Sequence, residues 1–192
     1  GKYAGKILSA GEYDAQGNLK IGIVYNLDTG LAAEQGEFSS GKLNGYGLRY
    51  SSRGIKHEAG IFKNGELVSG FIYNEEGKTV CYGDYSFGKL NGSGKIFCYN
   101  GNVLYQGELK NNEPNGYGAY YNCGSGKLKE QGYYNEGKLN GVGESYYTST
   151  GTLERQGQFK GGRLNGIGRT FYRNGQLQYI GYFKEGNPSG LC

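Results

Sequence analysis

The feature that most constrains this fold is a sequence unit of 24 or 25 residues that recurs along the chain. Its clearest mark is the pattern Leu-Asn-Gly-x-Gly at residues 43–47, 90–94, 139–143 and 164–168, with a close relative at 114–118. One such unit buries too little apolar surface to be stable alone, so repeated units fold by stacking on their neighbours. The pattern therefore predicts a single repeat array over residues 1–192.

The first glycine of each pattern serves as a marker of the repeat, and weaker copies that keep one glycine extend the series. The predicted repeat centres are Gly22, Gly45, Gly70, Gly92, Gly116, Gly141, Gly166 and Gly190. The copies at Gly22 and Gly70 lack the second glycine, and we expect local irregularity there.

Each unit divides into two short segments, such as residues 152–159 and 165–172, in which side chains of two kinds alternate. A period of two predicts a strand. Short turns that contain glycine, such as Asn174-Gly175, separate the segments and are typical of hairpins. The sequence thus predicts an all-β fold, an elongated single-layer antiparallel β-meander (a β-hairpin solenoid) of about eight repeats of 23–25 residues, with about sixteen strands.

The 39 glycines are not those of a collagen or of a disordered chain. They do not fall at every third position and only two prolines accompany them, which excludes collagen. The 20 Tyr and 8 Phe recur in register with the glycines, which argues against disorder. The glycines therefore indicate turns and close backbone approach.

The formal net charge of +4, from 21 basic and 17 acidic residues, is too small to favour a nucleic-acid partner. No apolar run is long enough to span a membrane as a helix. Cys98 and Cys123 fall at nearly equivalent places in neighbouring units, roughly 9–10 Å apart in a sheet, which exceeds the reach of a disulfide. Free thiols predict a reducing compartment and a cytoplasmic location, which includes association with the cytoskeleton or with a membrane.

The repeated motifs resemble those of a known family. Tyr105-x-Gly107-x-Leu109 followed by residues 115–118 (Asn-Gly-Tyr-Gly) is similar to the MORN repeat, whose pattern is Tyr-x-Gly-x-aromatic and then (His/Asn/Asp)-Gly-x-Gly. The chain departs from that pattern because Trp is absent and the leading Tyr is replaced in several copies. Its Gly-x-Leu openings at 126–128, 151–153 and 175–177 also resemble the variant MORN repeats of bacterial proteins, some of which neutralise toxins.

The resemblance implies a β-hairpin solenoid with an aromatic-lined groove that serves protein–protein contact, dimer formation or scaffolding. It also implies, less directly, the binding of lipid headgroups. MORN arrays occur beside catalytic domains in other proteins, and these 192 residues contain no such domain.

Two rows of residues are candidates for partner binding. The first row stands two residues before the recurring glycine and varies in charge and size: Glu34, Glu58, Cys81, Tyr105, Glu130, Arg155 and Tyr179. A row two residues after that glycine stays apolar: Phe38, Phe62, Tyr85, Tyr134, Phe159 and Phe183. We predict that the varied row lines a recognition face and that the constant row is packing. The alternative is that the varied positions are solvent-facing and unconstrained.

The second candidate row is a ladder of aromatic residues in the other strand of each unit: Tyr50, Tyr73, Phe97, Tyr121, Tyr146 and Phe171. Packing is the favoured interpretation, and a partly exposed ladder is also a docking surface. The predicted partner-binding residues are Glu58, Tyr105, Glu130, Arg155, Tyr179, Tyr121, Tyr146 and Phe171.

One turn of each unit also carries a basic residue: Lys42, Lys63, Lys89, Lys110, Lys138, Arg163 and Lys184. Such a row can bind anionic lipid headgroups. Glu66, Glu113, Glu136 and Glu185 share these turns, however, so a solvated edge that discourages edge pairing is the favoured interpretation.

No pattern of catalytic residues is present. The Gly-x-Gly pairs lie within strands rather than before a helix, so they do not form phosphate loops. His57 is the only histidine and has no nucleophile at a suitable offset, and no Cys/His cluster suggests a metal. We therefore predict no enzyme, no catalytic or metal-binding residues and no cofactor.

The predicted function is a non-catalytic protein–protein interaction or scaffold module that binds a protein or peptide in an aromatic-lined groove. The alternatives are a membrane-surface adaptor for acidic phosphoinositides and an immunity-like protein that neutralises a toxin. A homodimer is a further expectation, because the last unit stops at Leu191 and Cys192 and an unpaired end strand can pair with a second copy.

Overall fold

The computed structural model describes residues 8–190, which form sixteen strands and no helix. Contacts divide the chain into two compact parts, residues 1–89 and 90–192, each made of several repeats. From here on the word unit refers to one of these two parts, and a single 24- or 25-residue copy is called a repeat. No helix in the described part of the chain is long and apolar enough to cross a membrane. Leu191 and Cys192, on which the predicted homodimer depends, lie outside the described residues.

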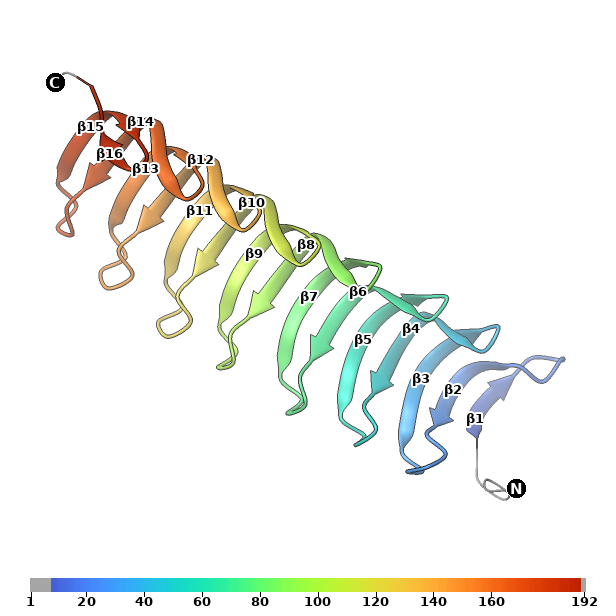
Figure 1. Ribbon diagram of the computed structural model, residues 1–192. Helices are drawn as coiled ribbons and strands as arrows, with labels where there is room; N and C mark the ends of the chain where they lie inside the picture. The colour runs from blue at the N-terminus through green and yellow to red at the C-terminus, as the bar shows by residue number, and fades with distance from the viewer. Residues whose placement is uncertain (1–7, 191–192) are drawn as a thin grey trace. The chain divides into compact units, whose positions relative to one another are not determined.

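Each unit is a meander in which every strand pairs antiparallel with the strand before it (Figure 1). The strands of the first unit are β1 (Ser9–Tyr13), β2 (Leu19–Tyr25), β3 (Ala32–Ser39), β4 (Lys42–Tyr50), β5 (Lys56–Lys63), β6 (Glu66–Tyr73) and β7 (Thr79–Ser86). Those of the second are β8 (Lys89–Phe97), β9 (Val103–Lys110), β10 (Glu113–Tyr121), β11 (Leu128–Asn135), β12 (Lys138–Tyr146), β13 (Leu153–Lys160), β14 (Arg163–Phe171), β15 (Leu177–Lys184) and β16 (Asn187–Pro188). The all-β antiparallel meander is confirmed.

A row of glycines crosses each unit at right angles to its strands. In the first unit the row consists of Gly11, Gly22, Gly36, Gly47, Gly60, Gly70 and Gly83, each opposite the next. In the second it consists of Gly94, Gly107, Gly118, Gly132, Gly143, Gly157, Gly168 and Gly181. A Cβ added to Gly132 would lie 2.5 Å from the Cα of Gly143, so the backbones approach too closely for a side chain.

The register corrects the alignment of the weaker copies. Gly70 faces Gly60 as Gly47 faces Gly36, so Gly70 takes the place of the second glycine of the pattern, and it is the first that is missing. Gly22 occupies the same row. Contrary to the expected local irregularity, these copies are less irregular than the complete copies. Both kinds of copy have a β-bulge before the row glycine, and a copy without the first glycine has one residue fewer in that bulge.

The core lies on one face of the sheet, which we term the inner face, while the opposite side is the outer face. Each hairpin pairs a residue two positions after the row glycine with one near the start of the next strand, as in Phe38 with Leu43 and Phe159 with Leu164. The constant aromatic row is buried, as predicted. The bare backbone of the glycine row gives these side chains room, since a Cβ on Gly168 would lie 3.0 Å from a methyl carbon of Leu164.

Tight turns hold consecutive repeats together. Their two central residues have left-handed φ, as at Glu136 and Gly137, which is the conformation of type I′ hairpins. The Gly162 amide donates a hydrogen bond of 2.8 Å to the carbonyl of Leu139, and Gly186 donates to Leu164 at the same distance. Each of these turns is thereby bonded to the preceding repeat.

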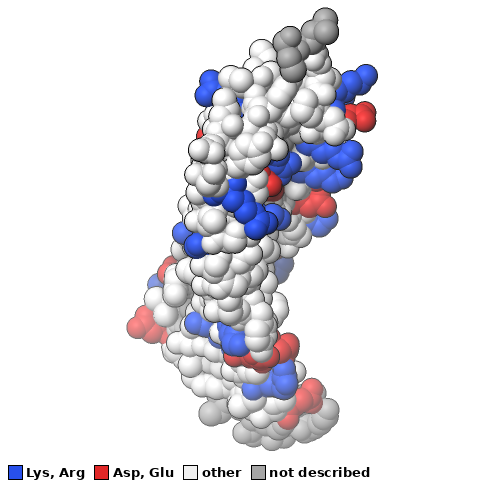
Figure 2. All heavy atoms as spheres, turned by 90° about the vertical axis from the view of Figure 1, so that its left-hand side faces the viewer, with Lys and Arg blue, Asp and Glu red and all other residues white. Residues whose placement is uncertain are grey.

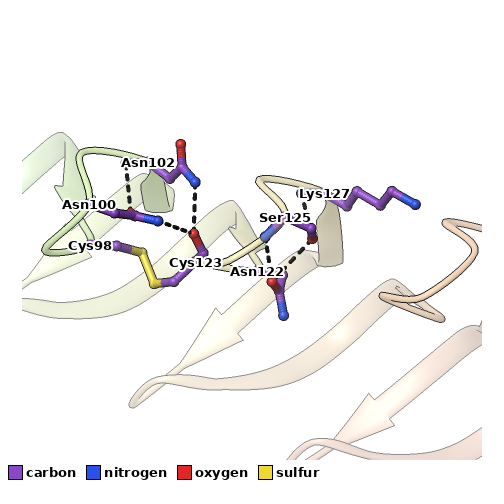
Figure 3. Close-up of a disulfide and its surroundings, with 7 residues drawn as sticks. All are labelled: Cys98, Asn100, Asn102, Asn122, Cys123, Ser125 and Lys127. Carbon is purple, nitrogen blue, oxygen red and sulfur yellow. Dashed lines mark hydrogen bonds between the residues drawn. A yellow bond between two sulfur atoms is a disulfide. The ribbon is translucent and has the colours of Figure 1, made fainter.

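Cys98 and Cys123 form a disulfide, so the expectation of free thiols at these positions is wrong (Figure 3). Their Cα atoms are 5.7 Å apart rather than 9–10 Å. Cys98 directly follows β8 and Cys123 is the second residue after β10, so both lie in turns and the spacing of strands in a sheet does not apply to them. The turns lean on each other, because Asn100 and Asn102 each donate a side-chain hydrogen bond of 2.7 Å to the Cys123 carbonyl.

The same offset recurs two repeats later without a disulfide. Tyr147 directly follows β12 and Arg173 is the second residue after β14, and the Arg173 guanidinium lies 5.6 Å from the centre of the Tyr147 ring. The disulfide therefore replaces a side-chain contact that the stacked turns already favour. The cytoplasmic location stays a prediction, but the argument from free thiols no longer supports it, because stable disulfides are typical of oxidising compartments.

We predict that Gly132→Ala lowers the free energy of unfolding by about 2–3 kcal/mol, since the new Cβ would collide with the backbone of β12. Urea unfolding measures the change. Gly124→Ala is the control, because a Cβ there would meet nothing closer than 3.4 Å, and its effect should stay within about 0.5 kcal/mol. Equal effects of the two substitutions would contradict the requirement for a bare backbone in the row.

Reduction of the disulfide should destabilise the second unit by about 3 kcal/mol, because the bond closes a loop between residues 25 apart. Thermal unfolding with and without a dithiol reductant tests this, and mass spectrometry under non-reducing conditions verifies the bond. In the double variant Cys98→Ala with Cys123→Ala, the reductant should have no effect on the melting temperature. If the reductant does not change the melting temperature of the wild type, the prediction is refuted.

Candidate functional site

The varied row lies on the inner face, next to the buried aromatic residues, and each unit extends it with residues from the intervening strands. In the second unit the opposing residues run Tyr105, Tyr120, Glu130, Ser145, Arg155, Thr170 and Tyr179. Sequence reasoning missed Tyr120, Ser145 and Thr170. Their common signal is their position two residues after the second glycine of the pattern.

Glu58 is engaged within the first unit. Arg49 donates from Nε to Glu34 at 3.0 Å and from Nη1 to Glu58 at 2.5 Å. It also donates from Nη2 to the Gly65 carbonyl at 2.6 Å, and its guanidinium lies 5.1 Å from the centre of the Phe62 ring. The two ion pairs are partly exposed and contribute at most about 1 kcal/mol each. Glu58 therefore has an internal partner.

Tyr105 is a core residue, and its prediction as a partner contact is wrong. Its side chain is 0% exposed, and its ring centre lies 4.9 Å from that of Tyr120 and 5.7 Å from that of Tyr134. Its hydroxyl donates to the Glu108 carbonyl at 2.9 Å. The Tyr105 ring lies over the glycine row. It fits there because Gly118 has no side chain, whereas a side chain at that position would fill the same space.

Glu130 on β11 and Arg155 on β13 lie on either side of Ser145, which is on β12. Arg155 donates from Nε to the Ser145 hydroxyl at 2.9 Å, and Ser145 donates to Glu154 at 3.1 Å. The Tyr134 hydroxyl donates to Glu130 at 3.4 Å. Arg155 and Glu154 are 34% and 35% exposed, so both remain accessible to a ligand.

A shallow depression opens at this place on the second unit. It is lined by Lys129, Glu130, Ser145, Tyr146, Tyr147, Thr148, Glu154 and Arg155. Its walls carry charges of both signs beside two tyrosines. The structure thus brings together three of the predicted residues, Glu130, Arg155 and Tyr146.

Tyr179 lies on the same row in β15 and is half-buried. Its ring packs edge-on against Phe183 with centres 5.1 Å apart. It lines a second depression, with Leu177, Gln178, Ile180, Gly181, Tyr182 and Gly190. Thr170 stands between Tyr179 and Arg155 in the row, so Tyr179 is two strands from the first depression.

The three second-strand aromatics among the predicted residues lie on the outer face. Tyr121, Tyr146 and Phe171 are half-buried, and alternation along each strand points them away from the varied row. The seven predicted residues of the second unit therefore belong to two opposite faces and do not form one site. Tyr146 also lines the depression, but its hydroxyl joins a polar network of the outer face.

That network surrounds Glu144. Tyr146 donates to the Glu144 carboxylate, Gln131 donates to it at 2.7 Å and Gln156 at 2.8 Å. The hydrogen bond from Tyr146, and next that from Gln131, lowers the pKa of Glu144. Burial, together with the bond to Glu144, raises the pKa of Tyr146 to about 12.

Burial also changes the chemistry of the inner face. It raises the pKa of Tyr85, Tyr105 and Tyr134 well above their ordinary value. Cys81, a free cysteine, has its Sγ 3.3 Å from the Tyr85 hydroxyl, and burial raises the pKa of this thiol. These groups stay protonated at neutral pH.

The surface carries both signs of charge. Figure 2 shows basic and acidic side chains beside one another on the face in view. Among residues 8–190 no group of three or more His, Cys, Asp or Glu residues is placed to hold a metal ion.

Comparison with protein families gives matches to the MORN repeat at residues 35–56, 81–103, 105–123, 131–152 and 156–177. These segments cover more than half of the chain, and each contains one Asn-Gly-x-Gly motif. The weaker copies at Gly22 and Gly70 fall outside them. Comparison with curated proteins gives no significant match.

Stability should fall as the pH rises from about 10 to 12. Above pH 10 the tyrosines of the unfolded chain lose their protons, whereas Tyr105, Tyr134 and Tyr146 keep theirs in the fold because their pKa values are raised. The folded state then binds more protons, so the free energy of unfolding decreases with pH.

Urea unfolding at pH 8 to 11.5 measures this slope, and absorbance at 295 nm follows tyrosine ionisation. Tyr105→Phe is the matched variant and should show a smaller slope, because it removes one of the protons that folding retains. Equal stability of the wild type at pH 8 and pH 11 would contradict the assignment.

Proposed function

This chain belongs to the MORN repeat family, whose repeats are generally associated with protein or membrane binding, and we propose that it is a non-catalytic module that binds a protein or peptide on the inner face of its second unit. The scaffold role of such a module follows from the same surface. That it is non-catalytic is part of this proposal and rests on the residue pattern alone.

One observation carries the proposal. Glu130, Ser145, Arg155, Thr170 and Tyr179 stand opposite one another along a line across five strands of the inner face. Beneath them Tyr134, Phe159 and Phe183 form a buried aromatic floor. A packed floor fixes chemically different side chains at set spacings, and this arrangement suits recognition better than a uniform surface.

The exposed groups favour a partner with charges of both signs. The Arg155 guanidinium has five N–H donors; its Nε donates to Ser145 and lies 3.5 Å from a Glu154 carboxylate oxygen, and its remaining N–H groups can bind a further carboxylate. The Glu130 carboxylate has further lone pairs for a basic side chain. Arg and Tyr are also the residues that most often dominate interfaces, which favours Arg155 and Tyr179 as the main contacts.

Toxin neutralisation and membrane binding are the two alternative functions, and we rank both below the binding of a protein or peptide. An immunity-like role would be one form of this proposal, with a toxin as the partner. Membrane binding would use the turn residues of the second unit, where Lys110, Lys138, Lys160, Arg163 and Lys184 face Glu113, Glu136 and Glu185. The net excess of two charges, at about 1 kcal/mol per charge near an anionic membrane, is too small to hold the protein there alone.

A quantitative pull-down from lysate of the source cells tests the proposal. The baits are the wild type and a variant with Glu130→Ala, Arg155→Ala and Tyr179→Ala. We expect a partner of the wild type to be depleted at least about tenfold with this variant, because contacts of this kind contribute more than about 1 kcal/mol each. A control variant carries Arg53→Ala and Glu75→Ala, an exposed pair in the first unit, and should capture the partner normally.

Unchanged melting temperatures of both variants are required before the capture is compared. Equal capture by the wild type and the inner-face variant would remove the inner face as the binding site. Capture of nothing, combined with salt-sensitive binding to phosphoinositide vesicles, would replace the protein partner by a membrane.

A further inference from the structure

The outer face of the second unit carries a line of exposed apolar side chains that none of the predicted binding residues belongs to. We term it the outer strip, and its members are Tyr117, Tyr133, Val142, Ile167 and Tyr182, which are between 51% and 67% exposed. Residues of this size are normally covered, and a sheet face of this kind usually packs against another element.

The outer strip runs from β10 to β15 and is interrupted at β13, where the polar Gln158 stands opposite Val142. Tyr117 stands opposite Tyr133 with ring centres 5.4 Å apart, and Ile167 stands opposite Tyr182. Between them, a Cβ on Gly141 would lie 3.1 Å from that of Tyr133, which brings this ring directly beside the backbone that carries Val142. Six strands at about 4.8 Å make the strip roughly 24 Å long and one residue wide.

The outer strip is built by the repeat itself. Tyr117, Val142 and Ile167 occupy the variable position of Asn-Gly-x-Gly, at the bulge that precedes the glycine row. The side chain of Glu108 accepts a hydrogen bond of 3.3 Å from the backbone amide of Tyr117, and Gln158 accepts one of 3.2 Å from that of Ile167. These bonds hold two of the bulges in place, so the strip is organised before any partner arrives.

Charge indicates what covers the strip. Residues 90–192 contain 11 basic and 7 acidic residues, whereas residues 1–89 contain ten of each, so the second unit carries the whole net charge of +4. Alternation along the strands places Lys110, Lys138, Lys160, Arg163 and Lys184 on the outer face at the tight-turn side of the strip. Glu113 at a strand end, with Glu136 and Glu185 in the turns themselves, offsets three of these five charges, so an excess of two basic side chains remains beside the strip.

This charge selects among the occupants. A second copy would bring the same basic side chains against one another, which like-charge repulsion disfavours. A membrane contact gains from a broad apolar patch rather than a line one residue wide. The strip does match the apolar stripe of an amphipathic helix, since about 16 residues of helix span 24 Å.

We propose that the outer strip docks an acidic amphipathic helix of a partner protein, with the apolar stripe of the helix on the strip and its carboxylates toward the turn lysines. This is helix-on-sheet packing completed between two chains. The site lies on the opposite face from the inner-face row, so it is independent of the function proposed above.

The probe for this proposal is a designed helical peptide of about 18 residues, with Leu along one side and Glu at the other positions. Its partner probe has Lys in place of Glu. Fluorescence anisotropy with the full chain should show that the acidic peptide binds, that added salt weakens the binding and that the basic peptide does not bind. Val142→Gln with Ile167→Gln should weaken the acidic peptide at least about tenfold, because both side chains lie at the centre of the contact.

Ile61→Gln is the matched control, since Ile61 is an exposed isoleucine in the corresponding row of the neutral first unit, and binding should not change. Arg155→Ala on the inner face should also leave binding unchanged, which separates this site from the inner-face function. Equal binding of both peptides, binding that ignores the double substitution, or no binding of the acidic peptide would overturn the proposal. Strip-dependent binding to phosphatidylserine vesicles without peptide binding would overturn it in favour of a lipid surface.

Discussion

The close approach of backbones along the glycine row is the constraint on which the rest of this structure depends. Where Gly132 faces Gly143 there is no room for a Cβ, and side chains from both ends of a strand can fold over the bare backbone between them. Tyr179 thereby reaches Phe183, although residues four apart in a straight strand would be about 13 Å apart. A single layer of strands obtains a core in this way without a second layer to cover it.

The same constraint places packing and recognition on one face. The varied row and the constant aromatic row both border the glycine row on the inner face. A residue of the varied row is therefore either buried in the core or exposed on the surface above the core. Tyr105 is absorbed, while Glu130 and Arg155 stay at the surface around Ser145. The outer face has no such core, and its exposed apolar residues are held by bulges instead. The two faces therefore present different chemistry to a partner.

The strands and turns could be read from the sequence because each depends on neighbours within a few residues. Alternation set the strand faces, and the buried ring of Phe159 and the outward side of Tyr146 both follow from it. The pairing of Gly70 with Gly60 could not be read in this way, because a bulge with one residue fewer shifts the register without changing the repeat length by more than a residue. Burial of Tyr105 also depends on Gly107 in its own strand and on Gly118 in the next strand, and the second of these contacts is not local in the sequence.

The sequence by itself determined the repeat, the antiparallel meander, the packing role of the constant aromatic row and the family, because these rest on local periodicity and motif spacing. Only the tertiary structure decided which candidates share a face, how far Tyr105 is buried, that Cys98 meets Cys123, and where apolar side chains stay uncovered. These properties arise from contacts between successive repeats. Contacts between successive turns, and side chains that lie over the bare backbone of the glycine row, set these distances. The spacing of strands in a flat sheet does not predict them.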